Sequence, residues 1–282
     1  MPTLSCSSGH QGVPCVLLPA QCSLSWLVSV ICPSVLAGDT TEMFPPTTLV
    51  KGMCLTDSSA PSRHHNCSGL SAFGEDFYLH LAPDARFIAP AFAAQYLGTA
   101  PGAARPRPGL RHCFYSGDVN GDRESFAALS LCGGLRGAFG YRGAEYTISP
   151  LPGGAAGGAH RLQAGGAPGG RAKRFASVPR YVETLVVADE SMVKFHGDDL
   201  QHYLLTLMAT AARLYKHPSI RNPIQISVVK FLLIGQDDKG PKVTGNAALT
   251  LRNFCAWQKK WNKVSDKHPE YWDTAILFTK QV

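Results

Sequence analysis

Hydrophobic and polar residues alternate along the chain from about residue 73. Phe77, Leu79 and Leu81 are separated by more polar side chains, and this alternation is typical of a half-buried strand. Gly, Pro and Asp punctuate the sequence that follows, as turn residues do. Further strands are predicted at residues 86–92, 112–116, 125–131 and 144–149. The pattern therefore predicts a small β-rich domain at residues 73–150.

A different pattern begins after residue 174. Apolar residues recur at steps of three and four from Leu200 to Tyr215, which predicts an amphipathic helix. A second helix is predicted at 246–260. Apolar runs predict strands at 181–188, 224–234 and 273–279. The order strand, helix, strand, helix, strand predicts an α/β fold with a mainly parallel sheet in residues 175–282.

Residues 151–174 separate these two regions. Eight glycines lie between residues 152 and 170, and so few apolar side chains predict a flexible linker. The linker ends in the tetrad R-A-K-R, a pattern that furin-type convertases cut; a solvated charge cluster is the alternative interpretation. The processing residues would be Arg171, Lys173, Arg174 and Phe175.

Residues 1–72 form a leader with two possible interpretations. Residues 24–32 resemble the apolar part of a signal peptide, but no basic residue precedes them and prolines interrupt the segment. A signal peptide and a leader that contributes no structure both remain open. Asn66 lies in an N-x-S triplet, which predicts a glycosylation site.

Composition excludes some classes of function. The 282 residues carry a net charge of +7 that is spread along the chain, whereas nucleic-acid binders concentrate theirs. We therefore expect no nucleic-acid partner, but some attraction to polyanions such as sulfated glycans. No apolar run approaches the roughly 18 to 20 residues that span a bilayer, so no membrane span is expected.

Nine cysteines are present and none forms a C-x-x-C pair, which argues against a zinc ribbon or thioredoxin motif. Cys113 and Cys132 lie in or beside predicted strands, and we expect a disulfide between them. The odd total leaves at least one thiol without a partner inside the chain.

Candidate chemistry is confined to a few carboxylates. Glu183 lies in an otherwise apolar strand, Asp273 opens the last predicted strand and Asp266 precedes it. If these strands are neighbours, the three could converge on a hard cation such as Ca²⁺; the alternative is strand-end charges that face water. None of the ten histidines lies in H-E-x-x-H, and His196 and His202 are expected to be surface or cap residues.

Long stretches of the chain resemble the ADAMTS family, a disintegrin and metalloproteinase with thrombospondin motifs. RAKRFASVPRYVETLVVADESMVKFHG and NAALTLRNFCAWQKKWNKVSDKHPEYWDTAILFT resemble the start of its metalloproteinase domain. FGEDFYLHLAPDARFIAPAF and SLCGGLRGAFGYRGAEYTISPL resemble its propeptide. The resemblance implies a β-rich propeptide before an incomplete metzincin-type domain of the M12B, reprolysin class.

The resemblance also implies a function. It points to a secreted zinc endopeptidase of the extracellular matrix, made as a zymogen, activated by a furin-type convertase and acting on matrix proteoglycans such as aggrecan and versican. It places structural calcium at Glu183, Asp266 and Asp273, and gives Cys255 a partner further along the domain.

The sequence departs from that family in one respect that concerns activity. It reaches Val282 without the H-E-x-x-H helix, so no zinc ligand can be assigned and no peptidase activity is expected from this stretch alone. The alternative function is a non-catalytic secreted fragment that binds matrix or the full-length protease.

Overall fold

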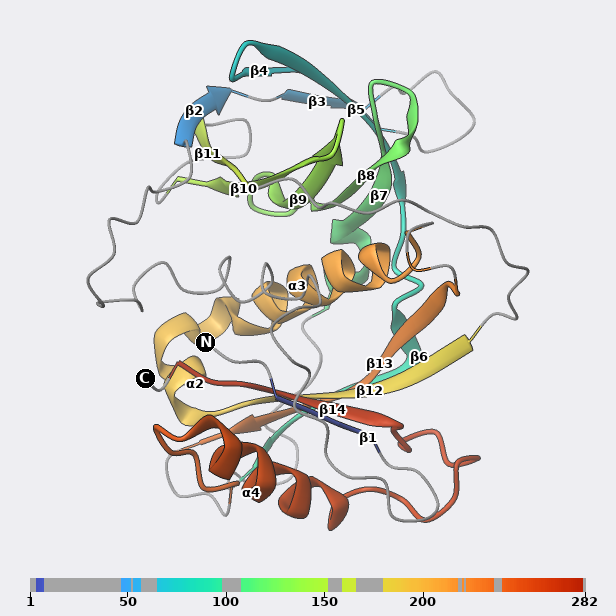
Figure 1. Cartoon of the computed structure of the whole chain (residues 1–282), viewed down its shortest axis with the longest axis vertical. Helices are drawn as coiled ribbons and strands as arrows, with labels where there is room; N and C mark the ends of the chain where they lie inside the picture. The colour runs from blue at the N-terminus through green and yellow to red at the C-terminus, as the bar shows by residue number, and fades with distance from the viewer. Residues whose placement is uncertain are drawn as a thin grey trace.

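The computed structural model places two β-sheets on either side of one long helix, α3 (Leu200–Leu214) (Figure 1). The structure describes residues 4–7, 47–51, 53–56, 65–97, 108–151, 159–165, 180–217, 220, 222–235 and 240–280. The fold is mixed α/β, with more strand than helix.

The first sheet has nine strands in the order β2-β11-β10-β9-β8-β7-β5-β4-β3, and all its pairings are antiparallel. Most neighbours in this sheet are also neighbours in sequence. The strands are β2 (Thr47–Lys51), β3 (Met53–Thr56), β4 (His65–Ala72), β5 (Glu75–Pro83), β7 (Phe114–Val119), β8 (Asp122–Ser130), β9 (Arg136–Tyr141), β10 (Ala144–Pro150) and β11 (Ala159–Ala164).

Aromatic side chains form the centre of this sheet's core. The rings of Phe77, Phe139 and Tyr146 pack against one another with centroids 4.9 to 5.2 Å apart. β5 and β7 approach so closely at Gly117 that a Cβ there would lie 1.8 Å from the carbonyl oxygen of His80. Only glycine fits at that position of the sheet.

The predicted flexible linker is wrong for residues 159–164. These residues form β11, which pairs with β10 on one side and β2 on the other. Leu162 is fully buried and His160 is 1% exposed. Two alternating buried side chains suffice to hold this short segment in the sheet, and the surrounding glycines concealed that alternation. The strand β4 likewise begins at His65, inside the range assigned to the leader.

The second sheet has five strands in the order β1-β14-β12-β13-β6. β12 pairs in parallel with both β13 and β14, β13 pairs in parallel with β6, and β1 pairs antiparallel with β14. The strands are β1 (Leu4–Ser7), β6 (Ile88–Leu97), β12 (Arg180–Ala188), β13 (Ile224–Ile234) and β14 (Thr274–Phe278).

Helices cover both faces of this second sheet. α2 (Glu190–His196) and α3 pack on one face, and α4 (Ala247–Lys259) packs on the other (Figure 1). Two short 3₁₀ turns, η1 (Leu110–Cys113) and η2 (Gly197–Asp199), precede β7 and α3. α3 is therefore enclosed between the second sheet and strand β8 of the first sheet.

Candidate functional site

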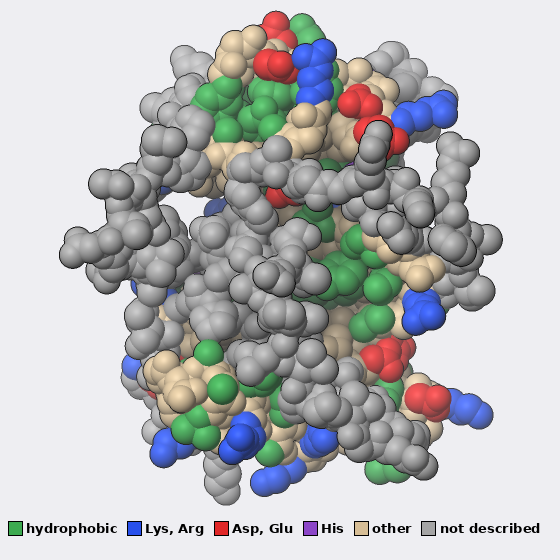
Figure 2. All heavy atoms as spheres, viewed as in Figure 1, with side chains coloured by type: hydrophobic (Ala, Val, Ile, Leu, Met, Phe, Trp, Pro, Cys, Tyr) green, Lys and Arg blue, Asp and Glu red, His purple; other side chains and the backbone are tan. Residues whose placement is uncertain are grey.

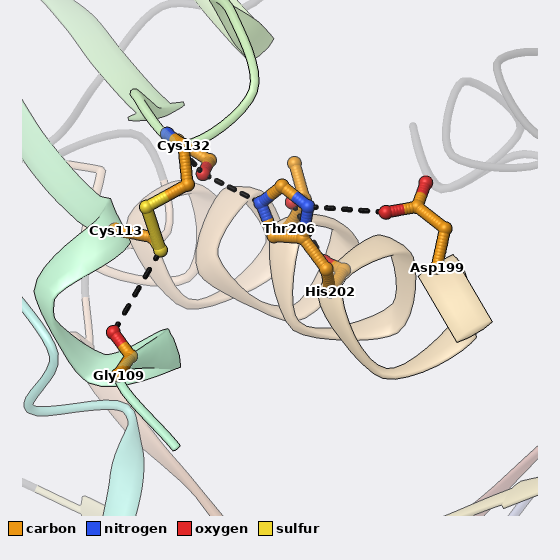
Figure 3. The surroundings of a disulfide bond; sticks show 7 residues. Gly109, Cys113, Cys132, Asp199, His202 and Thr206 are labelled. Atoms are coloured by element: carbon orange, nitrogen blue, oxygen red, sulfur yellow. Dashed lines mark hydrogen bonds and ion pairs between the residues drawn. A yellow bond between two sulfur atoms is a disulfide. The ribbon is translucent and has the colours of Figure 1, made fainter. Parts of the chain in front are cut away.

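The disulfide between Cys113 and Cys132 lies beside α3 (Figure 3). The sulfur atoms are 2.01 Å apart and the two residues are separated by 19 positions. Cys113 ends η1 and is buried, while Cys132 follows β8. The bridge holds the end of β8 against the start of β7, next to the face that meets α3.

Three polar residues meet next to this disulfide. A hydrogen bond of 2.7 Å joins Ser130 Oγ and His202 Nε2, and His202 Nδ1 lies 3.3 Å from Asp199 Oδ1. Ser130 belongs to β8 and His202 to the first turn of α3, whereas Asp199 ends η2 and is the N-cap residue of α3. Figure 3 shows His202 pointing towards Asp199 on one side and towards the disulfide on the other. The cluster therefore joins the first sheet directly to the helix.

The expected surface position of His202 is wrong. His202 is only 6% exposed, because α3 is covered both by β8 of the first sheet and by the second sheet. Ser130 is fully buried. The hydrogen bonds link serine to histidine and histidine to aspartate, as in a hydrolase triad. The serine oxygen is buried, however, so a substrate cannot reach it. The arrangement is a structural contact.

An ion pair extends the same contact. Arg136 Nη1, at the start of β9, lies 2.5 Å from Asp199 Oδ2. Burial alone would raise the pKa of Asp199, but hydrogen bonds from His202 and Arg136 lower that pKa to about 2. Asp199 is thus held ionised between two partners, His202 of α3 and Arg136 of the first sheet.

Two of the three predicted calcium ligands lie side by side: Glu183 belongs to β12, and Asp273 directly precedes β14, the strand paired with it. Asp273 Oδ2 accepts a hydrogen bond of 2.9 Å from the backbone N–H of Glu183, and the backbone N–H of Asp273 donates to the carbonyl oxygen of Glu183 at 2.9 Å. Asp266 lies in the exposed loop before β14. Burial raises the pKa of Glu183, and the nearby charges of Asp273 and Asp266 raise it further.

These three carboxylates are chemically suited to calcium, but they do not form a complete metal site by themselves. Carboxylate oxygens are the ligands that Ca²⁺ prefers, and a cation would relieve the repulsion among these charges. Among the described residues, however, no group of three or more His, Cys, Asp or Glu side chains is arranged to hold a metal ion. None of the ten histidines lies in H-E-x-x-H, so that zinc motif is not part of the donor set described here.

The other predicted sites divide into those the structure describes and those it does not. Arg171, Lys173, Arg174 and Phe175 lie outside the described residues. Asn66 lies in β4, opposite Leu55 of β3 and His80 of β5. Cys255 is buried on α4 and is disulfide-bonded within this chain, so a partner further along the domain is not needed here. No helix in the described part is long and apolar enough to cross a bilayer.

Comparison with known proteins identifies both halves of the chain. A model of the reprolysin family propeptide matches residues 56–120. The human protein "A disintegrin and metalloproteinase with thrombospondin motifs 15" is 61% identical over 263 residues, which cover 75% of this chain and 28% of that protein. The mouse protein "A disintegrin and metalloproteinase with thrombospondin motifs 1" is 46% identical, and the match covers 75% of this chain and 29% of that protein.

A more distant relative extends the match along the chain. The human protein "A disintegrin and metalloproteinase with thrombospondin motifs 4" is 43% identical over 308 residues. This match covers 95% of this chain and 36% of that protein. The chain thus spans about a third of the length of the curated relatives it matches. The chain belongs to the ADAMTS family, as a propeptide followed by the start of the metalloproteinase domain.

Proposed function

We propose that the chain is the amino-terminal part of a secreted zymogen, in which a β-rich propeptide is held against the first part of a zinc metalloendopeptidase domain. The observation that carries this proposal is the contact between the two regions. Ser130 and Arg136 of the propeptide segment bind His202 and Asp199 of the metalloproteinase segment. The identity to ADAMTS relatives supplies the class of protease.

Activation would occur by a furin-type convertase after Arg174. The R-A-K-R tetrad precedes β12, the first strand of the metalloproteinase segment, by only a few residues. A cut there would free Phe175 as a new amino terminus and leave the segment that begins at β12 intact.

Secretion of the chain from furin-competent cells tests this step. Mass spectrometry should find a fragment that begins at Phe175, and Arg174→Ala should abolish it while Arg161→Ala, an exposed arginine in β11, should not. An intact wild-type chain in the medium would contradict the proposal.

Matrix proteoglycans of the aggrecan and versican class are the proposed substrates of the complete protease. Zinc would be held by ligands that these 282 residues do not supply, so we expect no chelator-sensitive cleavage of either proteoglycan by this stretch alone. The alternative, a non-catalytic fragment that binds the full-length protease, draws support from the same missing motif. Binding of the purified chain to the full-length protease, without turnover, would favour that alternative.

Calcium is the second proposed metal. Glu183, Asp266 and Asp273 would contribute carboxylates to a Ca²⁺ site that further ligands complete, because their mutual repulsion favours a bound cation. In a chain extended through the rest of the domain, chelation should lower the melting temperature. Glu183→Gln should remove that response, and Glu145→Gln, a carboxylate of the first sheet, should keep it.

Sulfated glycans are a proposed partner of the α4 surface. Residues 239–265 contain six basic and no acidic side chains. Three of the basic side chains, Arg252, Lys259 and Lys260, are exposed, and Figure 2 shows Lys and Arg side chains gathered over α4. A concentrated positive surface attracts linear polyanions.

A further inference from the structure

Strand β6 belongs to the propeptide segment by sequence but to the second sheet by structure. It occupies the outer edge of that sheet, in parallel with β13. The register runs from Ala93 opposite Lys230 to Leu97 opposite Ile234, with an earlier pairing of Ile88 and Val228. The remaining propeptide strands, from β4 to β11, all belong to the nine-stranded sheet.

Side chains of β6 are buried on both faces of the sheet. Ala94 and Ile88 lie in the cluster that α3 covers, at 4% and 3% exposure. Ala89 and Leu97 lie in the cluster that α4 covers, both at 7% exposure. A strand buried on two faces is integrated like an interior strand, so β6 fills a position in the metalloproteinase core.

Aromatic packing adds to this contact. Phe92 of β6 meets Phe231 of β13 edge to face, with ring centroids 4.9 Å apart. Such pairs contribute beyond the area that they bury.

The irregular part of β6 has its own support. The register shifts between Val228 and Lys230, where β6 contains Pro90, a residue that cannot donate a backbone hydrogen bond. Arg111, from η1, donates to the carbonyl oxygens of Ile88 (3.0 Å), Ala89 and Pro90 (3.4 Å). A propeptide arginine thus satisfies the carbonyls that the ladder leaves out.

We propose that the edge of β13 is a strand-binding site of the metalloproteinase segment, and that β6 stays bound there after the linker is cut. The inference rests on the proposed function, namely that cleavage separates the propeptide from the segment that begins at β12. Cutting the linker breaks one peptide bond between the two segments, whereas the β6–β13 ladder and the packing on both faces of β6 remain. The occupant is this chain's own residues 88–97.

The test uses the full chain with a site for a specific viral protease inserted between residues 169 and 170, so that it does not depend on furin. Cys255→Ser forms the background, because Cys255 is disulfide-bonded and a covalent link would hold the fragments together. After cutting, the two fragments should co-elute in size exclusion at 1:1. The amides of residues 230–234 should keep their hydrogen-exchange protection within about threefold.

A matched pair of variants isolates β6. Ala94→Asp places a charge in the apolar cluster under α3, whereas Ala91→Asp places the same charge at an exposed position of the same strand. Ala94→Asp should raise exchange in residues 230–234 at least tenfold after cutting, and Ala91→Asp should leave it near the unmodified value.

Two results would overturn the proposal: equal protection of residues 230–234 in both variants, or loss of that protection in the unmodified chain on cutting. The second measurement needs no β6 variant, so a misfolded Ala94→Asp chain does not remove the test. Failure of furin to cut the native linker would instead contradict the proposed function and leave this inference standing.

Discussion

The two sheets are built in different ways. Between β4 and β10 most of the first sheet's pairings join neighbouring segments, and its core cluster lies within residues 70–164. The second sheet takes its strands from segments far apart in the sequence, since β6 pairs with β13 and β1 pairs with β14. One sheet is therefore largely complete in itself, and the other depends on segments that precede the metalloproteinase region.

The propeptide therefore makes two separate contributions to the structure. Its own sheet forms a platform on which Ser130, at the end of β8, contacts His202 of α3, and Arg136, at the start of β9, contacts Asp199 of η2. Its strand β6 supplies part of the core on which α3 and α4 rest. Damage to the platform and damage to the second sheet should then have distinguishable consequences.

The largest expected effect comes from the platform core. Phe139 is fully buried and contacts Phe77 edge to face. Phe139→Ala should destabilise the chain by about 3–5 kcal/mol, because it leaves a cavity. Hydrogen exchange should rise first in β5, β9 and β10. Equal loss of protection in β12 and β14 at the same denaturant concentration would show that the two sheets unfold as one unit.

Removal of the disulfide is expected to have the next largest effect. Replacing Cys113 and Cys132 together by alanine should cost about 2–4 kcal/mol, chiefly by lengthening the unconstrained loop of the unfolded chain. Denaturant unfolding under non-reducing conditions measures this cost. The expectation fails if dithiothreitol destabilises the double variant as much as the unmodified chain.

The pH dependence of the contact with α3 should be smaller. The pKa of Asp199 is about 2 in the folded chain against an ordinary value of 3.8. Ionised Asp199 therefore stabilises the fold above about pH 4, and this contribution is lost as the pH falls towards 2. Because 45% of the side chain is exposed, the effect should stay below about 1 kcal/mol.

Comparing the acid unfolding of Asp199→Asn with that of the unmodified chain measures the contribution of ionised Asp199 to stability. Asp84 also has a pKa of about 2, because the hydrogen bonds that it accepts from Arg86 and Ser116 outweigh the raising effect of burial. Asp84 is retained in both chains. Identical slopes between pH 4 and 2 would mean that Asp199 does not hold the contact.

The α4 surface should show the smallest change. Lys259→Glu with Lys260→Glu should lower the salt concentration at which heparin releases the chain, because both lysines are exposed. Arg123→Glu with Arg142→Glu makes the same charge change on the first sheet. If both pairs shift elution equally, net charge alone explains binding and α4 is not a distinct surface.

Much of the fold could be predicted from local patterns. Alternation at Phe77, Leu79 and Leu81 predicts β5, and the apolar run at 224–234 coincides with β13. The position of β6 could not be predicted, because alternation shows that a segment is a strand but not which sheet it joins. β11 was missed because two buried side chains stand among glycines.

The contact between the first sheet and α3 is harder to predict from the sequence than the strands are. Leu205, Ala209 and Ala212 form a second buried stripe on α3, and His202 lies one turn before it. Two apolar stripes on one helix indicate that the helix is buried on two sides. This pattern would have predicted a buried position for His202. Its partner Ser130 carries no such signal, because serine is common on exposed strands.

The direct contact between the propeptide platform and the metalloproteinase segment can be measured by a double-mutant cycle between Ser130 and His202. Ser130→Ala, His202→Ala and the double variant should be compared by denaturant unfolding. The buried hydrogen bond of 2.7 Å predicts a coupling of about 1–2 kcal/mol. Additivity within about 0.3 kcal/mol would contradict the contact.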